Sequence, residues 1–149
     1  MTALFRSFEH AGLVWYVNDD NYVSLFQEVL SGKVELQMVT EKAAKPRFAV
    51  AHHEAKGVWM RLVIDGGKIT SQYRPTEKEA WKVVGQSDLP AAGTARVGVM
   101  AGGVPKDAER YVRFRTFRIV ENQHREVGER SGCFTSDGRQ DRPGRGDRR

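Results

Sequence analysis

The chain has 149 residues, of which 24 are Lys or Arg and 19 are Asp or Glu, giving a formal charge of +5 and a pI near 9.6. This length suits one domain of ordinary size, and Cys133, the only cysteine, excludes an internal disulfide and a cysteine-rich zinc site. No uncharged run approaches the roughly 20 residues that span a bilayer. No signal peptide is visible at the N-terminus, so a cytoplasmic location is the default expectation.

The chain up to residue 50 reads as a series of short strands. Residues 12–17 are apolar, aromatic or β-branched, and Asn18-Asp19-Asp20-Asn21 separates them from a similar run at 22–27, which predicts a hairpin. Ser31-Gly32 marks the next turn, and the alternating run at 34–39 is typical of a half-buried strand. Phe48-Ala49-Val50 is a shorter candidate strand.

Residues 58–74 form the clearest unit. Asp65-Gly66-Gly67 lies between two alternating runs, which strongly predicts a hairpin because its turn requires positive φ angles that glycine adopts easily. The alternation places Met60, Leu62 and Ile64 on one face and Trp59, Arg61 and Val63 on the other. The first face is predicted to be buried, with Phe114 and Phe117 opposite or nearby.

Three further strands are predicted after this hairpin, at 81–85, 96–101 and 111–120. The last run changes phase between Phe114 and Phe117, which predicts a bulge near Arg115-Thr116. Helix formers at 76–80 are too few for more than one turn. About eight strands with polar turns between them predict an all-β fold, an antiparallel β-sandwich over residues 1–120.

Residues 121–149 differ in composition from the rest of the chain. They contain seven Arg and six acidic residues, with Val127 as the one aliphatic and Phe134 as the one aromatic residue. Such a segment buries too little apolar surface to offset the entropy lost on ordering, so a disordered tail is predicted. The interleaved acids disfavour a basic arm for nucleic acid.

No catalytic motif is present in the sequence. The patterns G-x-S-x-G, G-x-x-x-x-G-K-[ST] and H-E-x-x-H are absent, and no pair of carboxylates has the arrangement expected of a sandwich-type glucanase. His52-His53-Glu54 is the one cluster suggestive of a metal, but neighbouring histidines in a strand point to opposite sides, so a polar loop is favoured. Asp19-Asp20 offers oxygen ligands suited to calcium, although turn chemistry is the favoured interpretation. No metal site or cofactor is therefore predicted.

The order of several weak motifs resembles a known family. The matching blocks are Ala11-Gly12-Leu13-Val14-Trp15-Tyr16 with Asp20-Asn21-Tyr22-Val23, then Val58-Trp59-Met60-Arg61-Leu62 with Asp65-Gly66, Tyr73, Trp81 and Gly85, and finally residues 96–101 and 114–119. Together they resemble the concanavalin A-like, jelly-roll β-sandwich appended to the C-terminus of bacterial β-xylosidases and arabinanases. The resemblance implies a non-catalytic domain that packs on a glycosidase catalytic domain and, in relatives, binds sugar or calcium.

This chain departs from the family pattern at three points. Arg115 replaces the usual acidic residue between the last aromatics, the strands expected before Ala11 are mostly absent, and no catalytic domain precedes the sandwich. The resemblance therefore implies a truncated or divergent version of the domain. Missing strands would leave a sheet edge free for self-association or for a partner subunit.

The outward face of the 58–74 hairpin supplies the candidate carbohydrate-binding residues Trp59, Arg61, Gln72 and Arg74. An indole offers a flat apolar surface to a sugar ring, and Arg and Gln can hydrogen-bond its hydroxyls. Packing of Trp59 against a neighbouring strand, loop or partner is an equally physical interpretation. The resemblance implies a structural role inside the sandwich for Trp81.

Three functional hypotheses follow from the sequence. The favoured one is a non-catalytic, carbohydrate-associated β-sandwich module whose partner is a glycan or a glycosidase domain. The alternative is a protein-interaction or structural module that has lost sugar recognition. A small glycan-active enzyme is disfavoured by the missing carboxylate pair, and neither nucleic acid nor a membrane is an expected partner.

Overall fold

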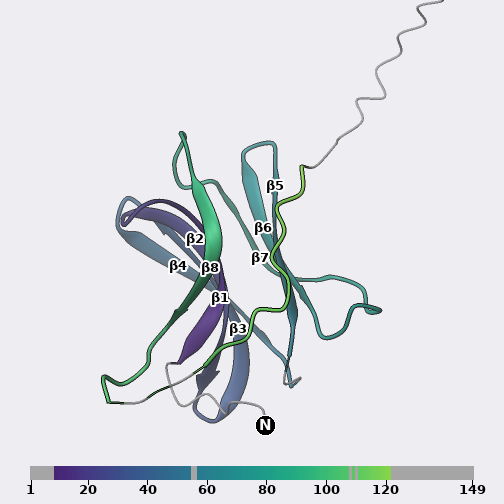
Figure 1. The fold of residues 1–149 in the computed structure, drawn as a ribbon. Helices are drawn as coiled ribbons and strands as arrows, with labels where there is room; N and C mark the ends of the chain where they lie inside the picture. The colour runs from purple at the N-terminus through teal and green to yellow at the C-terminus, as the bar shows by residue number, and fades with distance from the viewer. Residues whose placement is uncertain (1–8, 55–56, 108, 110, 122–149) are drawn as a thin grey trace, which may run out of the picture. The chain divides into compact units, whose positions relative to one another are not determined.

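The computed structural model describes residues 9–54, 57–107, 109 and 111–121. In this part of the chain all regular structure is β-strand, arranged as a five-stranded and a three-stranded antiparallel sheet (Figure 1). The strands are β1 (His10–Asn18), β2 (Asn21–Leu30), β3 (Lys33–Lys42), β4 (Lys45–His52), β5 (Trp59–Asp65), β6 (Lys68–Arg74), β7 (Lys82–Asp88) and β8 (Arg96–Gly102). The predicted all-β antiparallel sandwich is confirmed. Among the described residues, no helix has the length and apolar character needed to cross a membrane.

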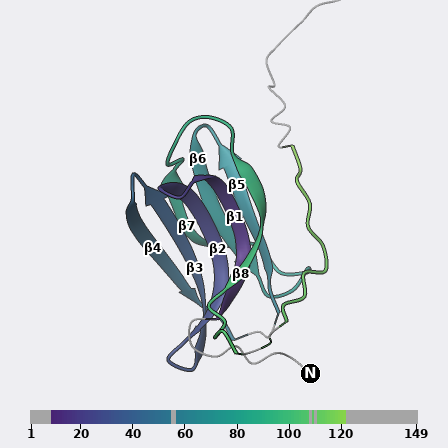
Figure 2. The ribbon, with the colours of Figure 1, turned by 60° about the vertical axis from the view of Figure 1, so that its left-hand side comes forward.

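The strand order follows from two consecutive meanders and one returning strand. The five-stranded sheet has the order β4-β3-β2-β1-β8, and the three-stranded sheet has the order β5-β6-β7. Figure 2 shows the first sheet in front of the second. After β7 the chain returns to the first sheet, where β8 pairs antiparallel with β1 from His10↔Gly102 to Tyr16↔Arg96.

Two groups of buried side chains join the sheets. In one, Trp15, Val23 and Met38 of the five-stranded sheet pack with Ile69 of β6, and in the other Leu25 and Leu36 pack with Tyr73 of β6. Leu62 and Val84 are partly buried against both groups. Because Ile69 and Tyr73 project into the core, the residues that alternate with them on β6 face away from it.

The turn between β1 and β2 also supports the neighbouring hairpin. The Asn18 side-chain oxygen accepts hydrogen bonds from the Asp20 amide and from the Asn21 side chain, as expected for turn chemistry. The Ala43 amide donates to the Asn21 side chain, and the Ala44 amide donates to the Asp20 carbonyl. These contacts hold Ala43 and Ala44 at φ angles of 50° and 58°, which alanine rarely adopts. The predicted turn is confirmed.

The predicted 58–74 hairpin is present, with its turn at the predicted glycines. Gly66 and Gly67 have φ angles of 55° and 81°, which a two-residue turn between twisted strands requires. Met60 and Leu62 face the core and pack against it, as predicted, but they are half-buried and not fully buried. Ile64 was predicted to be buried with them, but it is 40% exposed. It lies on β5, an edge strand, whereas its cross-strand partner Ile69 on the central strand β6 is fully buried.

The predicted last strand is wrong. Residues 111–121 form no strand, and Phe114 and Phe117 are 42% and 46% exposed instead of packing opposite Leu62. An alternating pattern produces a strand only where a neighbouring strand accepts its backbone hydrogen bonds, and this segment pairs with none in the described structure. The bulge predicted near Arg115 is therefore also wrong.

Several predictions concern parts of the chain that the structure does not describe. The tail predicted to be disordered lies outside the described residues from position 122 onward, together with Cys133. The boundary between residues 1–120 and 121–149 stays a prediction. Within the described residues, β4, β8, β5 and β7 each have one side without a paired strand, so self-association through an edge also stays a prediction.

Candidate functional site

The β5–β6 hairpin brings the four predicted site residues together on its outer face. Trp59 lies directly opposite Arg74 in the strand register, and Arg61 lies opposite Gln72. The alternate pairs, Met60 with Tyr73 and Leu62 with Ser71, face inward, and Tyr73 and Ser71 are buried there. The alternation of the two strands therefore separates the core side chains from the site side chains.

Side-chain contacts link these outward residues into one cluster. The Arg61 Nε donates a hydrogen bond of 2.6 Å to the Gln72 side-chain oxygen. The Arg74 guanidinium carbon lies 5.4 Å from the centre of the Trp59 ring. Both distances are typical of attractive contacts, and the second is within the range of a cation–π interaction. The arginines are therefore held in place by their neighbours.

Trp81 belongs to the same cluster, although the family resemblance implied a position inside the sandwich. The guanidinium carbons of Arg61 and Arg74 lie 4.2 and 4.5 Å from the centre of its ring. The reason is the register of β7: Lys82 pairs with the inward Tyr73, so Trp81 falls on the outward phase shared with Arg74. We call Trp59, Arg61, Gln72, Arg74 and Trp81 the Trp–Arg surface.

The Trp–Arg surface carries two cations close to one another. Burial and the neighbouring Arg74 charge both lower the pKa of Arg61 from its usual value. Neither guanidinium forms an ion pair with a carboxylate of the described residues. The Arg74 Nε is buried and has no hydrogen-bond partner in this part of the chain. The surface therefore combines partly exposed indole rings with uncompensated positive charge.

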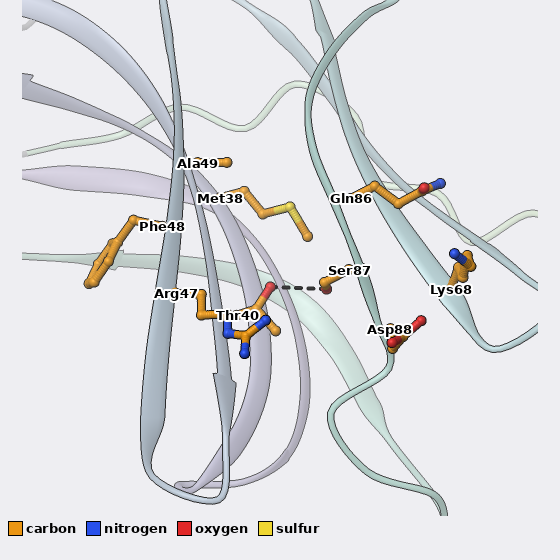
Figure 3. Close-up of a pocket in the computed structure, with 9 residues that line it drawn as sticks. All are labelled: Met38, Thr40, Arg47, Phe48, Ala49, Lys68, Gln86, Ser87 and Asp88. Atoms are coloured by element: carbon orange, nitrogen blue, oxygen red, sulfur yellow. Dashed lines mark hydrogen bonds between the residues drawn. The ribbon is translucent and has the colours of Figure 1, made fainter.

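A hollow of about 420 Å³ lies where β4 and β7 approach each other (Figure 3). Its lining residues are Met38, Thr40, Arg47, Phe48, Ala49, Lys68, Gln86, Ser87 and Asp88. The Thr40 hydroxyl donates a hydrogen bond of 3.0 Å to the Ser87 hydroxyl, which links the two sheets across it. No pattern in the sequence indicates this hollow, because it arises from the packing of strands that are distant along the chain.

The residues considered for metal binding have other contacts. The exposed His52 side chain lies 3.3 Å from the Glu35 carboxylate, whereas His53 is buried with its ring 5.9 Å from that of Tyr73. The two histidines thus point to different sides, as predicted. The Asp19 carboxylate accepts a hydrogen bond of 2.7 Å from the Tyr16 hydroxyl. No group of three or more His, Cys, Asp or Glu able to hold a metal occurs among the described residues.

The buried His53 predicts a loss of stability in mild acid. Burial, with a smaller contribution from Lys82, lowers the pKa of His53 from 6.5, so the unfolded chain binds a proton more readily than the folded one. Its contribution to stability should be complete above about pH 7 and decline as the pH falls below about 6.5. Chemical denaturation between pH 8 and pH 5 measures this dependence.

A matched pair of variants isolates the His53 contribution. His53→Phe keeps the aromatic contact with Tyr73 and removes the titrating group, so its unfolding free energy should depend less on pH than that of the wild type. His52→Phe, at the exposed neighbouring position, should retain the wild-type dependence. An unchanged pH dependence in His53→Phe would contradict the assignment.

The strands and their packing define the class of protein. Two antiparallel sheets pack face to face, the first and last strands of the sandwich pair with each other, and the outer face of the smaller sheet carries the Trp–Arg surface. This is a β-sandwich module of the concanavalin A-like class. Residues 2–122 match the family described as "Protein of unknown function (DUF1349)", and the chain belongs to that family. A search of the curated proteins finds no match.

Solved structures show the same fold. A functionally unknown protein from Saccharomyces cerevisiae has a TM-score of 0.59 and 21% identity, over 66% of this chain and 54% of that one. The GH43 BlXynB protein from Bacillus licheniformis has a TM-score of 0.61 and 21% identity, over 69% of this chain and 22% of that one. A mutant of the bacterial protein gives a TM-score of 0.58 at 22% identity, over 67% of this chain and 22% of that one. The chain thus spans about half of the yeast protein and under a quarter of the bacterial one. These likenesses establish the fold.

Proposed function

We propose that this chain is a non-catalytic carbohydrate-binding module and that the Trp–Arg surface is its sugar site. The observation that carries the proposal is the convergence of Trp59, Arg61, Gln72 and Arg74, together with Trp81, on one outward face. Similarity of the sandwich to part of a GH43 protein supports it, as does the sequence resemblance to accessory domains of glycosidases.

The chemistry of the Trp–Arg surface suits a sugar. Both indole rings are partly exposed, and Trp59, with a single guanidinium 5.4 Å from its centre, offers apolar area for the C–H face of a pyranose. The guanidinium groups and the Gln72 amide supply donors that are already oriented by their mutual contacts, which lowers the entropy lost on binding. No catalytic role is assigned to any residue, because the sequence has no carboxylate pair arranged for glycoside hydrolysis.

Calorimetric titration tests this function. Oligosaccharides of xylan, arabinan and β-glucan should be titrated into the wild type, with at least one binding at sub-millimolar to millimolar concentration. Trp59→Ala should lose that binding while keeping its melting temperature within a few degrees, because loss of a stacking ring removes much of the contact area.

Phe48→Ala is the matched control for the sugar titration. Phe48 is an exposed aromatic residue at 66% exposure, and it belongs to β4 of the other sheet, at the rim of the hollow. Its variant should bind like the wild type. Binding lost in Phe48→Ala and kept in Trp59→Ala would move the site away from the Trp–Arg surface. Hydrolysis of any glycan in the panel would instead favour an enzyme.

A protein-interaction module is the second candidate function. It is favoured by β4, whose outer side has no paired strand in the described structure and which exposes Phe48 and Val50 on one face. An exposed strand with apolar side chains can accept a strand from a second copy or a partner. The absence of heat with every glycan at millimolar concentration would put this candidate first.

A further inference from the structure

We propose that the Trp–Arg surface selects acidic saccharides, with a uronic acid carboxylate bound by Arg61 and Arg74. This inference rests on the proposed sugar-binding function and names the class of sugar. The reasons lie in the charge of the two arginines, in the hydrogen-bond donors of their guanidinium groups and in the indole rings beside them.

The first reason is an unbalanced pair of like charges. Both guanidinium carbons lie within 4.5 Å of the centre of the Trp81 ring, and the Arg74 charge lowers the pKa of Arg61, so the two cations repel each other. No carboxylate of the described residues pairs with either one. A neutral sugar would leave this repulsion in place, whereas a carboxylate between the two groups would relieve it.

The second reason is the supply of free donors. A guanidinium has five N–H donors in a planar fork that fits a carboxylate with two parallel hydrogen bonds. Arg61 uses its Nε on Gln72, which leaves the outer nitrogens for a ligand. The Arg74 Nε is buried and therefore closed to a ligand, so Arg74 would contact one through its outer nitrogens, for which the described structure shows no hydrogen bond.

The third reason is the surrounding aromatic frame. The indoles of Trp59 and Trp81 flank Arg74, and the Trp81 ring also contacts Arg61. A uronic acid presents a carboxylate and an apolar ring face on the same small unit, which matches a cation placed beside an indole. An isolated inorganic anion would interact with the two charges only and would gain nothing from the apolar area of the rings.

A matched pair of ligands tests the selection. A xylo-oligosaccharide with a glucuronic acid branch and the same oligosaccharide without it should be titrated calorimetrically into the full chain at low salt. The acidic ligand should bind about 10-fold more tightly, the scale of one charge-assisted hydrogen-bond pair. This ratio should shrink as salt is added, since part of the gain is electrostatic.

Variants assign the selection to the two arginines. Arg74→Gln and, independently, the more exposed Arg61→Gln should weaken the acidic ligand more than the neutral one and so reduce the ratio to about 2-fold or less. Using both keeps the test valid if one variant unfolds. Arg47→Gln, on β4 at the hollow, should keep the full wild-type ratio. Trp59→Ala should lose both ligands.

The outcomes separate this inference from the function on which it rests. Equal affinity of the wild type for the acidic and neutral ligands would overturn the selection and leave sugar binding standing. Binding of neither ligand would overturn sugar binding itself. Displacement of the acidic oligosaccharide by equimolar sodium sulfate at constant ionic strength would also overturn the selection, since it would show an unspecific anion site.

Discussion

Replacement of Gly12 by alanine should strongly destabilise the sandwich. Gly12 lies on β1 opposite Phe26, and a Cβ at this position would lie 1.9 Å from the Leu25 carbonyl oxygen and 2.5 Å from the Phe26 Cα. Both atoms are backbone, so β1 and β2 would have to separate. We expect a cost of about 3 kcal/mol or more, equivalent to a fall of at least about 10 °C in melting temperature for a domain of this size.

Gly98→Ala is the control for this substitution. Gly98 also lies on a strand of the five-stranded sheet, opposite Val14, but a Cβ there would meet no atom within 4 Å. Its melting temperature should equal or slightly exceed that of the wild type, because alanine loses less backbone entropy than glycine on folding. A similar fall in the melting temperature of both variants would mean that the glycines stabilise the strands for a reason other than the close contact between the β1 and β2 backbones at Gly12.

Ile69→Ala should produce the second large effect. Ile69 is fully buried and joins β6 to Trp15, Val23 and Met38 of the facing sheet. Removing a buried side chain of this size costs about 2–5 kcal/mol, through lost burial and the cavity that remains. Urea denaturation followed by tryptophan fluorescence measures this loss.

The neighbouring isoleucine supplies the control. Ile64 is the direct cross-strand partner of Ile69 and shares its face of the hairpin, yet it is 40% exposed. Ile64→Ala should cost less than about 1 kcal/mol, since much of its surface already contacts solvent. Equal costs at the two positions would show that the facing sheet covers the edge strand β5 as fully as the central strand β6.

The outward face of the 58–74 hairpin could be predicted because all its determinants are local. The Asp65-Gly66-Gly67 turn fixes the pairing of Trp59 with Arg74 and of Arg61 with Gln72, and alternation fixes the face. The same reasoning predicted the β1–β2 hairpin from Asn18 to Asn21.

Features that depend on distant strands could not be predicted in this way. The register between β6 and β7 shifts at Ser71/Gln72, and this shift decides the face of Trp81. The 111–120 run has the pattern of a strand, but whether it pairs depends on a neighbour that local sequence does not specify. The hollow beside Arg47 and Asp88 depends on how two sheets meet.

The pairing of β8 with β1 has a consequence for the order in which the chain folds. His10 and Gly102 are partners although the two meanders lie between them, whereas β1 to β4 and β5 to β7 pair through short turns. Contacts so distant in sequence close a long loop and form slowly. During synthesis, one side of β1 therefore stays unpaired until the residues near 102 have been made. In this interval the unpaired side can pair with another chain, so a newly made chain is prone to aggregate through β1.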